Sequence, residues 1–201
     1  MEPVASQPPV HIVSGLPRSG TSMMMAMLQA GGLELLTDNA RGPDRENPRG
    51  YFELEAVKGL RRGQQAPWLE RAPGKGVKVI SRLLYELPAC CNYNVILMRR
   101  PIGEVLASQR QMVLARGGAV DAGQEASLAQ VFGDHLAEVE AWMAVNNNIR
   151  SLAVDYPDVV SRPVEQASRV ADFLQLPMEV EAMAATVDPA LHRQRLCAGP
   201  E

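Results

Sequence analysis

The amino-acid sequence predicts an α/β fold in three layers, in which helices flank a central, mostly parallel sheet of about four or five strands. Short apolar runs alternate with longer segments of helical periodicity along the chain of 201 residues. The first apolar run leads through a turn containing glycine directly into a helix, an arrangement that suits phosphate binding. The length fits one domain over residues 1–201, with residues 1–9 expected to be disordered.

The predicted strands are short apolar runs, as expected where both faces of a parallel sheet are covered. They are residues 11–16, 33–36, 77–81, 94–98 and 151–154. The predicted helices follow the helical apolar period or begin at a proline. They are residues 21–30, 54–62, 101–116, 128–143, 163–174 and 179–187. The polar segments 37–50 and 64–76 carry Gly and Pro and are predicted to be irregular.

Composition argues against several classes of protein. Twenty Lys and Arg against 23 Asp and Glu give a formal net charge of −3, whereas proteins that coat nucleic acids are usually strongly basic. No run approaches the roughly 20 apolar residues that span a bilayer, and the N-terminus lacks the pattern of a signal peptide. Three cysteines, an odd number, suit a reducing compartment. We expect a cytoplasmic protein with neither nucleic acid nor membrane as a partner.

The strongest local motif lies between the first strand and the first helix. Gly15 and Gly20 have the spacing of a nucleotide-hydrolase phosphate loop, but Thr21 stands where that loop carries its lysine. Arg18 lies inside the loop instead. The strand 94–98 is followed by two arginines rather than by the aspartate that holds Mg²⁺ in such enzymes. These residues indicate a site for an oxyanion bound by Arg and hydroxyl groups without a metal ion.

The segment Pro17-Arg-Ser-Gly-Thr-Ser22 resembles the 5′-phosphosulfate-binding loop of the P-loop sulfotransferases that use 3′-phosphoadenosine 5′-phosphosulfate (PAPS). The resemblance extends over about residues 10–195. It implies that PAPS is the donor and adenosine 3′,5′-bisphosphate (PAP) the product. The implied ligands of the 5′-phosphate are Arg18, Ser19, Gly20, Thr21 and Ser22.

A second element of the sequence resembles the 3′-phosphate site of the same family, in which an arginine ends a strand and a serine follows in the next helix. Arg100 and Ser108 have the family's spacing. The two side chains can converge on one phosphate, because the arginine leaves the carboxyl end of the strand and the serine lies two turns into the helix. Arg99 is the alternative to Arg100, because it aligns better with the family's proline through Pro101.

Sulfuryl transfer requires a base that takes a proton from the acceptor. The candidate base is Glu53, because residues 47–53 resemble a segment of several bacterial family members. Glu46 and Glu55 are the next candidates. The alternative role of Glu53 is to stabilise the start of the helix that follows it.

The remaining candidates are less specific. The glycine-rich loop that many family members use on the adenosine side is not visible, and Arg193 and Arg195 are suggested in its place. Lys78 either faces the site or is an ordinary lysine on the edge of the sheet. His11 begins a strand away from the loop, and His135 lies on an apolar helix face, where a core position is expected.

The resemblance implies an in-line transfer of a sulfuryl group from PAPS to a hydroxyl or amine of a small-molecule acceptor. Glu53 would remove the acceptor proton and Arg18 would stabilise the departing PAP. The segments 39–50 and 64–76 are the expected walls of the acceptor site. Two other functions stay open: an atypical P-loop kinase or NTPase that needs Mg²⁺, and a catalytically idle module that binds PAP.

Overall fold

The computed structural model describes residues 7–38, 42, 44, 47, 50–62, 66–115, 117–119, 123 and 125–192. Four parallel strands form the sheet, and β1 and β3 occupy its two central positions. In spatial order they are β2 (Gly76–Lys78), β1 (Val10–Gly15), β3 (Tyr93–Arg99) and β4 (Ile149–Asp155). The prediction of a parallel α/β sheet is confirmed.

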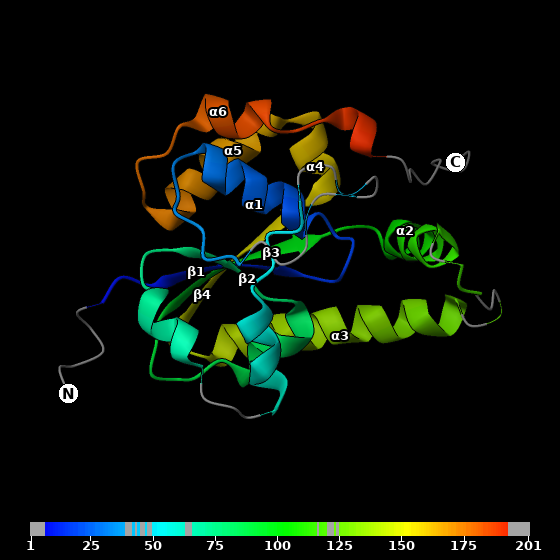
Figure 1. Cartoon of the computed structure of the whole chain (residues 1–201), viewed down its shortest axis with the longest axis horizontal. Coiled ribbons are helices and arrows are strands. Elements are labelled where there is room, and N and C mark those ends of the chain that lie inside the picture. Colours follow the sequence, from blue (N-terminus) through cyan, green and yellow to red (C-terminus); the bar gives the residue numbers. More distant parts are fainter. Residues whose placement is uncertain are drawn as a thin grey trace.

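Helices cover both faces of the sheet, which gives the predicted three layers (Figure 1). One face carries α1 (Thr21–Ala30), α4 (Tyr156–Ser161), α5 (Pro163–Leu174) and α6 (Val180–Ala185). The opposite face carries α3 (Glu125–Val145) and the 3₁₀ helices η2 (Glu55–Arg62), η3 (Pro67–Arg71) and η4 (Ser81–Glu86). The helix α2 (Ile102–Ala115) continues from the end of β3, and η6 (Pro189–Leu191) follows α6.

Alternation along the central strands divides the core in two. In β3, Tyr93, Val95 and Leu97 belong to the cluster on the α3 face, whereas Ile96 and Met98 belong to the cluster on the α1 face. Successive side chains of a strand point to opposite faces, so this pattern follows directly from strand geometry. Continued past Met98, the same alternation directs the next two residues, both arginines, to opposite faces.

The long predicted helix is present, but its apolar side is only partly covered. Val139 and Met143 are buried, whereas Leu128 is 41% exposed and Val131 is 56% exposed. Figure 1 shows the first half of α3 extending past the sheet beside α2. The packing of α3 on the sheet therefore rests on its second half.

Four predicted elements differ in the structure. Of the predicted strand 77–81, only residues 77 and 78 belong to β2, and η4 begins at Ser81. Residues 33–36 form no strand: Leu35 makes one bridge with Gly76, because β2 has only three residues and little edge to pair with. The segment 54–62 is helical but of the 3₁₀ type, and the predicted irregular segment 64–76 contains η3. Three further short helices, η4, α4 and η6, follow β2, β4 and α6, and the apolar pattern does not predict them.

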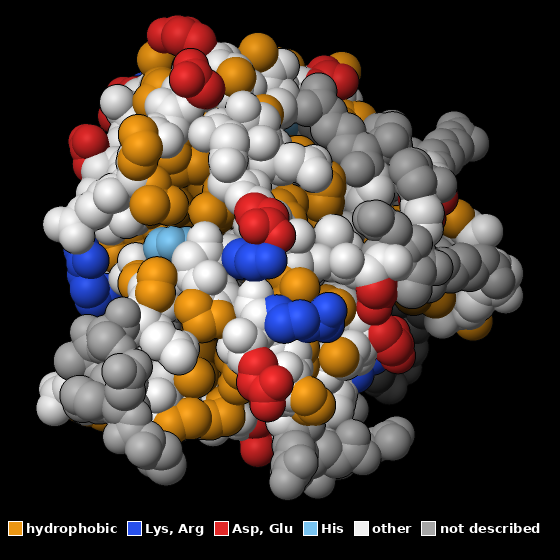
Figure 2. All heavy atoms as spheres, turned by 60° about the vertical axis from the view of Figure 1, so that its left-hand side comes forward, with side chains coloured by type: hydrophobic (Ala, Val, Ile, Leu, Met, Phe, Trp, Pro, Cys, Tyr) orange, Lys and Arg blue, Asp and Glu red, His pale blue; other side chains and the backbone are white. Residues whose placement is uncertain are grey.

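The predicted disorder of residues 1–9 falls mostly on residues 1–6, which lie outside the described part of the chain. Across the described ranges, none of the helices has both the length and the apolar character needed to cross a bilayer. On the face drawn in Figure 2, acidic and basic side chains lie interspersed among apolar ones rather than gathered by sign.

Candidate active site

The loop between β1 and α1 requires glycine at two positions. Gly15 and Gly20 have φ angles of 146° and 100°. A β-carbon at Gly15 would lie 2.6 Å from the carbonyl oxygen of Met98, and one at Gly20 would lie 2.4 Å from Cδ2 of Tyr156. The spacing noted in the sequence therefore reflects close packing against β3 and α4. Gly20, at the N-cap of α1, makes no side-chain hydrogen bond to the first turn. The first N–H groups of a helix have no partner within the helix and point out of its start, here toward the loop.

Replacing Gly20 with alanine is expected to destabilise the protein more than replacing Gly32. Both residues have φ near 100°, at 100° and 95°, so both variants carry the backbone strain of the left-handed region. Only Gly20→Ala adds a clash, because nothing lies within 4 Å of a β-carbon at Gly32. Urea unfolding should give an additional loss of about 1–3 kcal/mol for Gly20→Ala. Equal losses for the two variants would contradict this packing.

A pocket of about 380 Å³ lies where the four strands end. Residues that follow each strand reach its wall: Arg18 after β1, Lys78 at the end of β2, Arg100 after β3 and Tyr156 after β4. In open parallel sheets, ligands bind at the carboxyl ends of the strands where successive connections diverge to opposite sides. Here β2 and β3, the next two strands along the chain, lie on opposite sides of β1. The connections therefore diverge at the carboxyl end of β1, which is where the pocket lies.

Arg18 and Arg100 line one end of this pocket, whereas Ser108 is buried, contacts Arg18 and is not among the lining residues. Nε of Arg18 donates to Oγ of Ser108 at 2.9 Å, and Nη1 of Arg100 donates to the carbonyl oxygen of Arg18 at 3.2 Å. The guanidinium of Arg100 lies 4.4 Å from the centre of the Tyr156 ring. The sequence separated Arg18 and Ser108 by 90 positions, and the fold brings them into contact.

The two arginines after Met98 separate as the strand alternation requires. Nε of Arg99 donates to Oε1 of Glu140 at 2.8 Å, on the α3 face. Arg100 instead lines the pocket, with only 7% of its side chain exposed. This placement favours Arg100 over Arg99 as the residue available to a ligand of the pocket.

A buried carboxylate and a histidine complete this end, and both were missed in the sequence. Oε2 of Glu104 accepts from Nε of Arg100 at 2.9 Å and lies 2.8 Å from Nε2 of His192. His192 also packs edge-on against Tyr156, with ring centres 5.0 Å apart. Glu104 follows Arg100 by four residues, a spacing at which oppositely charged side chains on a helix can pair, so the sequence contained a signal for this contact. Nothing local identified His192, which comes from the chain beyond η6.

The candidate bases lie in different places. Glu53 lines the pocket, whereas Glu55 forms an exposed ion pair with Lys58, with Nζ 2.6 Å from Oε2. The backbone N–H of Glu55 at the start of η2 donates to Oδ2 of Asp38 at 2.6 Å, so the carboxylate that caps this helix start belongs to Asp38 rather than to Glu53. Glu46 lies outside the described residues.

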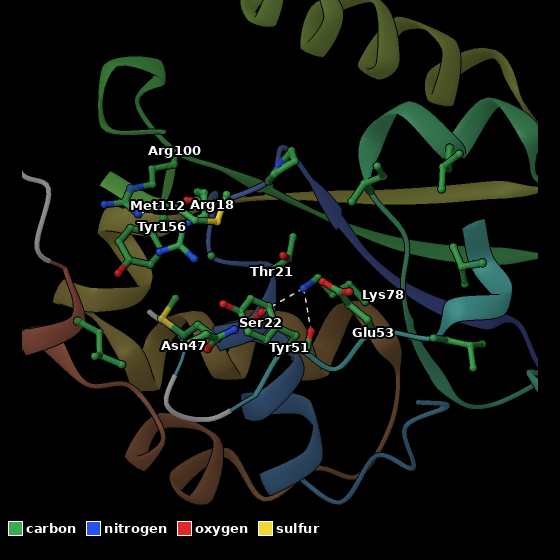
Figure 3. A pocket seen from close by; sticks show the side chains of 18 of the residues that line it. Arg18, Thr21, Ser22, Asn47, Tyr51, Glu53, Lys78, Arg100, Met112 and Tyr156 are labelled. Carbon is green, nitrogen blue, oxygen red and sulfur yellow. Dashed lines mark hydrogen bonds between the residues drawn. The ribbon is translucent and has the colours of Figure 1, made fainter. Parts of the chain in front are cut away.

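Lys78 faces the pocket, although it lies on the edge strand β2. Its Nζ donates to Oγ of Ser22 at 3.1 Å and to the carbonyl oxygen of Tyr51 at 2.8 Å. Figure 3 shows Arg18, Arg100 and Tyr156 at one end of the pocket, with Lys78 and Glu53 farther along it. The lysine thus connects the start of α1 with the segment that carries Glu53.

The remaining predicted residues divide between wall and interior. Gly20, Thr21 and Ser22 line the pocket. Ser19 does not, because its side chain is buried beneath the loop and its hydroxyl has no partner among the described residues. Ser19 can face a ligand only through its backbone.

Two of the histidines lie away from the pocket. His11 is buried beside Asn94, and burial lowers its pKa. His135 is half-buried and bonds Ser81 at 2.9 Å, and burial followed by the charge of Arg82 lowers its pKa. Arg193 and Arg195 lie outside the described residues. Of the expected acceptor walls, Asn47 reaches the pocket, and no described residue of 66–76 lines it.

The charge of the pocket wall is predominantly positive in the described part of the chain. Four lining side chains are cationic and two are acidic: Arg18, Lys58, Lys78, Arg100, Glu53 and Asp188. A site with this balance, formed where a helix begins, favours an anionic ligand such as a phosphate ester.

The fold and the site together define a parallel α/β protein with a cationic pocket at the carboxyl ends of its strands. The model of the family described as the sulfotransferase domain matches residues 8–191, and the chain belongs to that family of transferases. Among curated proteins, none matches this sequence.

Solved structures of sulfotransferases share the fold at low sequence identity. The sulfotransferase domain of the curacin biosynthetic pathway superposes with a TM-score of 0.55 at 16% identity, over 96% of this chain and 93% of that one. Sulfotransferase STF1 of Mycobacterium tuberculosis H37Rv gives 0.62 at 20% identity, over 91% and 71%. A sulfotransferase of Alicyclobacillus acidocaldarius gives 0.51 at 11% identity, over 84% and 81%. These similarities confirm the fold.

Proposed function

We propose that this protein transfers a sulfuryl group from PAPS to a hydroxyl or amine of a small-molecule acceptor. The observation that carries the proposal is the convergence of Arg18, Arg100 and the start of α1 on one pocket that also contains Glu53. PAPS supplies a sulfuryl group attached to a phosphate that leaves as part of PAP. The residues suit such a donor, because two guanidinium groups and a helix N-terminus can receive a ligand with two phosphate groups.

In this proposal, the two ends of the nucleotide are bound by different residues. The backbone of residues 19–22 and the hydroxyls of Thr21 and Ser22 hold the 5′-phosphate. Arg100 holds the 3′-phosphate, with Ser108 beside it. Glu104 orients Arg100 by accepting from its Nε, and His192 supports Glu104 from the other side. Arg18 stabilises the negative charge that develops on the departing phosphate.

The acceptor in this proposal enters from the side of Glu53 and Lys78. Glu53 accepts the proton of the attacking hydroxyl or amine as the new bond to sulfur forms. Lys78 contacts Ser22 at the phosphate loop and Tyr51 two residues before Glu53, so it can hold the donor and the base segment in register. Proton removal and charge stabilisation are thereby assigned to opposite ends of the transferred group.

Isothermal titration calorimetry with PAP, ATP and ATP–Mg²⁺ separates this proposal from a P-loop kinase or NTPase. We expect PAP to bind more tightly than ATP–Mg²⁺, because Thr21 replaces the loop lysine of nucleotide hydrolases. Tighter binding of ATP–Mg²⁺ would overturn the assignment. If PAP binds but no label is transferred from PAPS to any acceptor tried, the protein is instead a catalytically idle binding module.

The role of Arg100 has a selective test. Arg100→Ala should weaken the binding of PAP about 10- to 100-fold, as expected for the loss of a charge-assisted contact. The binding of adenosine 5′-monophosphate, which lacks the 3′-phosphate, should change little. Arg99→Ala is the matched control, because Arg99 pairs with Glu140 on the opposite face, and both affinities should be retained.

Arg100→Ala leaves the buried Glu104 with one fewer partner, so the double variant Arg100→Ala/Glu104→Gln is measured in parallel. It should show the same selective loss of PAP affinity without an unpaired carboxylate. An equal loss for PAP and adenosine 5′-monophosphate in both variants would exclude Arg100 from the 3′-phosphate site.

A further inference from the structure

The chain that follows η6 places a titratable side chain beside the pair formed by Arg100 and Glu104. The turn of η6 fixes the backbone there: Asp188 accepts from the backbone N–H of Ala190 at 2.9 Å, and the backbone N–H of His192 donates to the carbonyl oxygen of Pro189 at 3.1 Å. From this position the imidazole of His192 reaches Glu104 on α2, 88 positions earlier in the chain.

Arg100, Glu104 and His192 form a buried group of charged and titratable side chains. They are 7%, 6% and 9% exposed, respectively. One oxygen, Oε2 of Glu104, accepts from Nε of Arg100 at 2.9 Å and lies 2.8 Å from Nε2 of His192. Water screens charges poorly in such a place, so the charge of one side chain affects what the other two can bind.

The other titratable neighbours of His192 come from α4 and from its own segment. The ring of Tyr156 meets the imidazole edge-on, with centres 5.0 Å apart, and also lies 4.4 Å from the guanidinium of Arg100. Asp188, four residues before His192, accepts from the backbone of η6. Among the described residues, the carboxylate that pairs with the imidazole is therefore that of Glu104.

We propose that His192 is a positioning residue of the donor site, which holds Glu104 against Arg100 and takes up a proton when the 3′-phosphate of PAPS or PAP binds at Arg100. This inference rests on the proposed sulfuryl transfer and adds a dependence on pH to its donor site. Histidine suits the role, because it is the side chain that ordinarily changes its charge between about pH 5 and 8. Both its neutral and its protonated form can donate from Nε2 to Glu104.

The direction of the pH dependence follows from the charges. With a neutral His192, the positive charge of Arg100 and the negative charge of Glu104 cancel, so the three side chains offer a phosphate no net charge. With a protonated His192 they offer a net positive charge. A bound phosphate therefore stabilises the protonated form, and by linkage the protonated form binds the phosphate more tightly. The affinity for PAP should rise as the pH falls and decline as the pH rises.

Calorimetry of PAP at about pH 6.5 and about pH 8.5, in buffers with different heats of ionisation, measures both the affinity and the uptake of protons. We expect PAP to bind about three- to tenfold more tightly at the lower pH, the change that partial uptake of one proton gives over this range. Adenosine 5′-monophosphate lacks the 3′-phosphate, and its affinity should depend less on pH.

His192→Gln separates the charge of His192 from its contact with Glu104, because glutamine can still donate a hydrogen bond but carries no charge at any pH. At the lower pH, its affinity for PAP should fall to the value that the unaltered protein has at the higher pH, and its proton uptake should be smaller. His135→Gln is the matched control: His135 bonds Ser81 outside the pocket, so this variant should keep the pH dependence of the unaltered protein.

Two results for His192→Gln would overturn the proposal. One is an affinity and a proton uptake that match those of the unaltered protein at both pH values. The other is a loss of affinity of the same size at both pH values, which would mean that the imidazole acts only through its shape and its hydrogen bond.

The two levels of inference fail in different ways. If the unaltered protein does not bind PAP at either pH, the proposed sulfuryl transfer is wrong and the role of His192 falls with it. If PAP binds and Arg100→Ala loses affinity selectively, but His192→Gln keeps the pH dependence, only the assignment of His192 is wrong.

Discussion

Glu53→Gln is expected to reduce the rate of sulfuryl transfer in a single turnover by about 10²- to 10⁴-fold, the usual contribution of a general base. Glutamine has nearly the shape of glutamate, so the wall of the pocket is retained, but the neutral amide cannot take a proton from the acceptor. The affinity for PAP should not fall, because the substitution removes a negative charge from a site that binds an anion. Rapid-quench measurements with labelled PAPS give the rate, and calorimetry gives the affinity.

Glu55→Gln is the control for this prediction. Glu55 lies two residues further along the chain, and its exposed carboxylate pairs with Lys58 at 2.6 Å outside the proposed reacting position. Transfer by Glu55→Gln should remain close to that of the unaltered protein. If Glu53→Gln transfers sulfuryl groups at an undiminished rate, Glu53 is not the base, and Glu46 becomes the candidate to test.

Arg18→Ala should lower the rate of transfer by about 10²- to 10³-fold, comparable to the loss of one donor that stabilises developing negative charge. Arg18 has a φ of 78°, a region in which arginine and alanine experience similar backbone strain because both carry a β-carbon. The loss should therefore report the guanidinium rather than the loop conformation. Arg18→Lys should restore part of the rate, since lysine keeps the charge but lacks the forked donor geometry.

The comparison of Arg18→Ala with Ser108→Ala separates charge stabilisation from positioning when both variants are saturated with PAPS, because Ser108 is also assigned to the 3′-phosphate site. Ser108 accepts from Nε of Arg18, so its removal deletes one contact of the guanidinium and keeps the charge. We expect Ser108→Ala to cost less transfer activity than Arg18→Ala. If Ser108→Ala proves as damaging as Arg18→Ala while both bind PAP normally, orientation of Arg18 matters more than its charge.

The sequence predicted the parts of the site that depend on local geometry. Two glycines five residues apart between a strand and a helix specify a tight loop, and Gly20 meets Tyr156 too closely for any other residue. The pairing of Arg100 with Ser108, which the family resemblance implied, stays a prediction: Ser108 accepts from Nε of Arg18, and Arg100 donates to the carbonyl oxygen of Arg18. The apolar runs of β1 and β3 were equally predictable, since a strand covered on both faces is apolar throughout.

Other parts of the site depended on distant contacts and had no reliable local signal. The sequence left open whether Lys78 faces the site or lies on the outside of an edge strand. The pairing of β2 with β1 decides this, because it brings Nζ of Lys78 to Ser22 at the start of α1. His192 reaches Glu104 across 88 positions. The segment 33–36 has the composition of a strand, but β2 offers it only a single bridge.

By itself, the sequence determined where β1 to β4 and the helices α1, α2, α3, α5 and α6 lie along the chain, the tight loop between β1 and α1, and the presence of two arginines after Met98. Only the tertiary structure decided that Arg99 turns toward Glu140 while Arg100 turns toward Arg18, and that Glu53 rather than Glu55 lines the pocket. The physical reason is the range of the interactions involved. Backbone angles and apolar periodicity are set by neighbouring residues, whereas the direction and partners of a side chain at the end of a strand are set by the elements that pack against it.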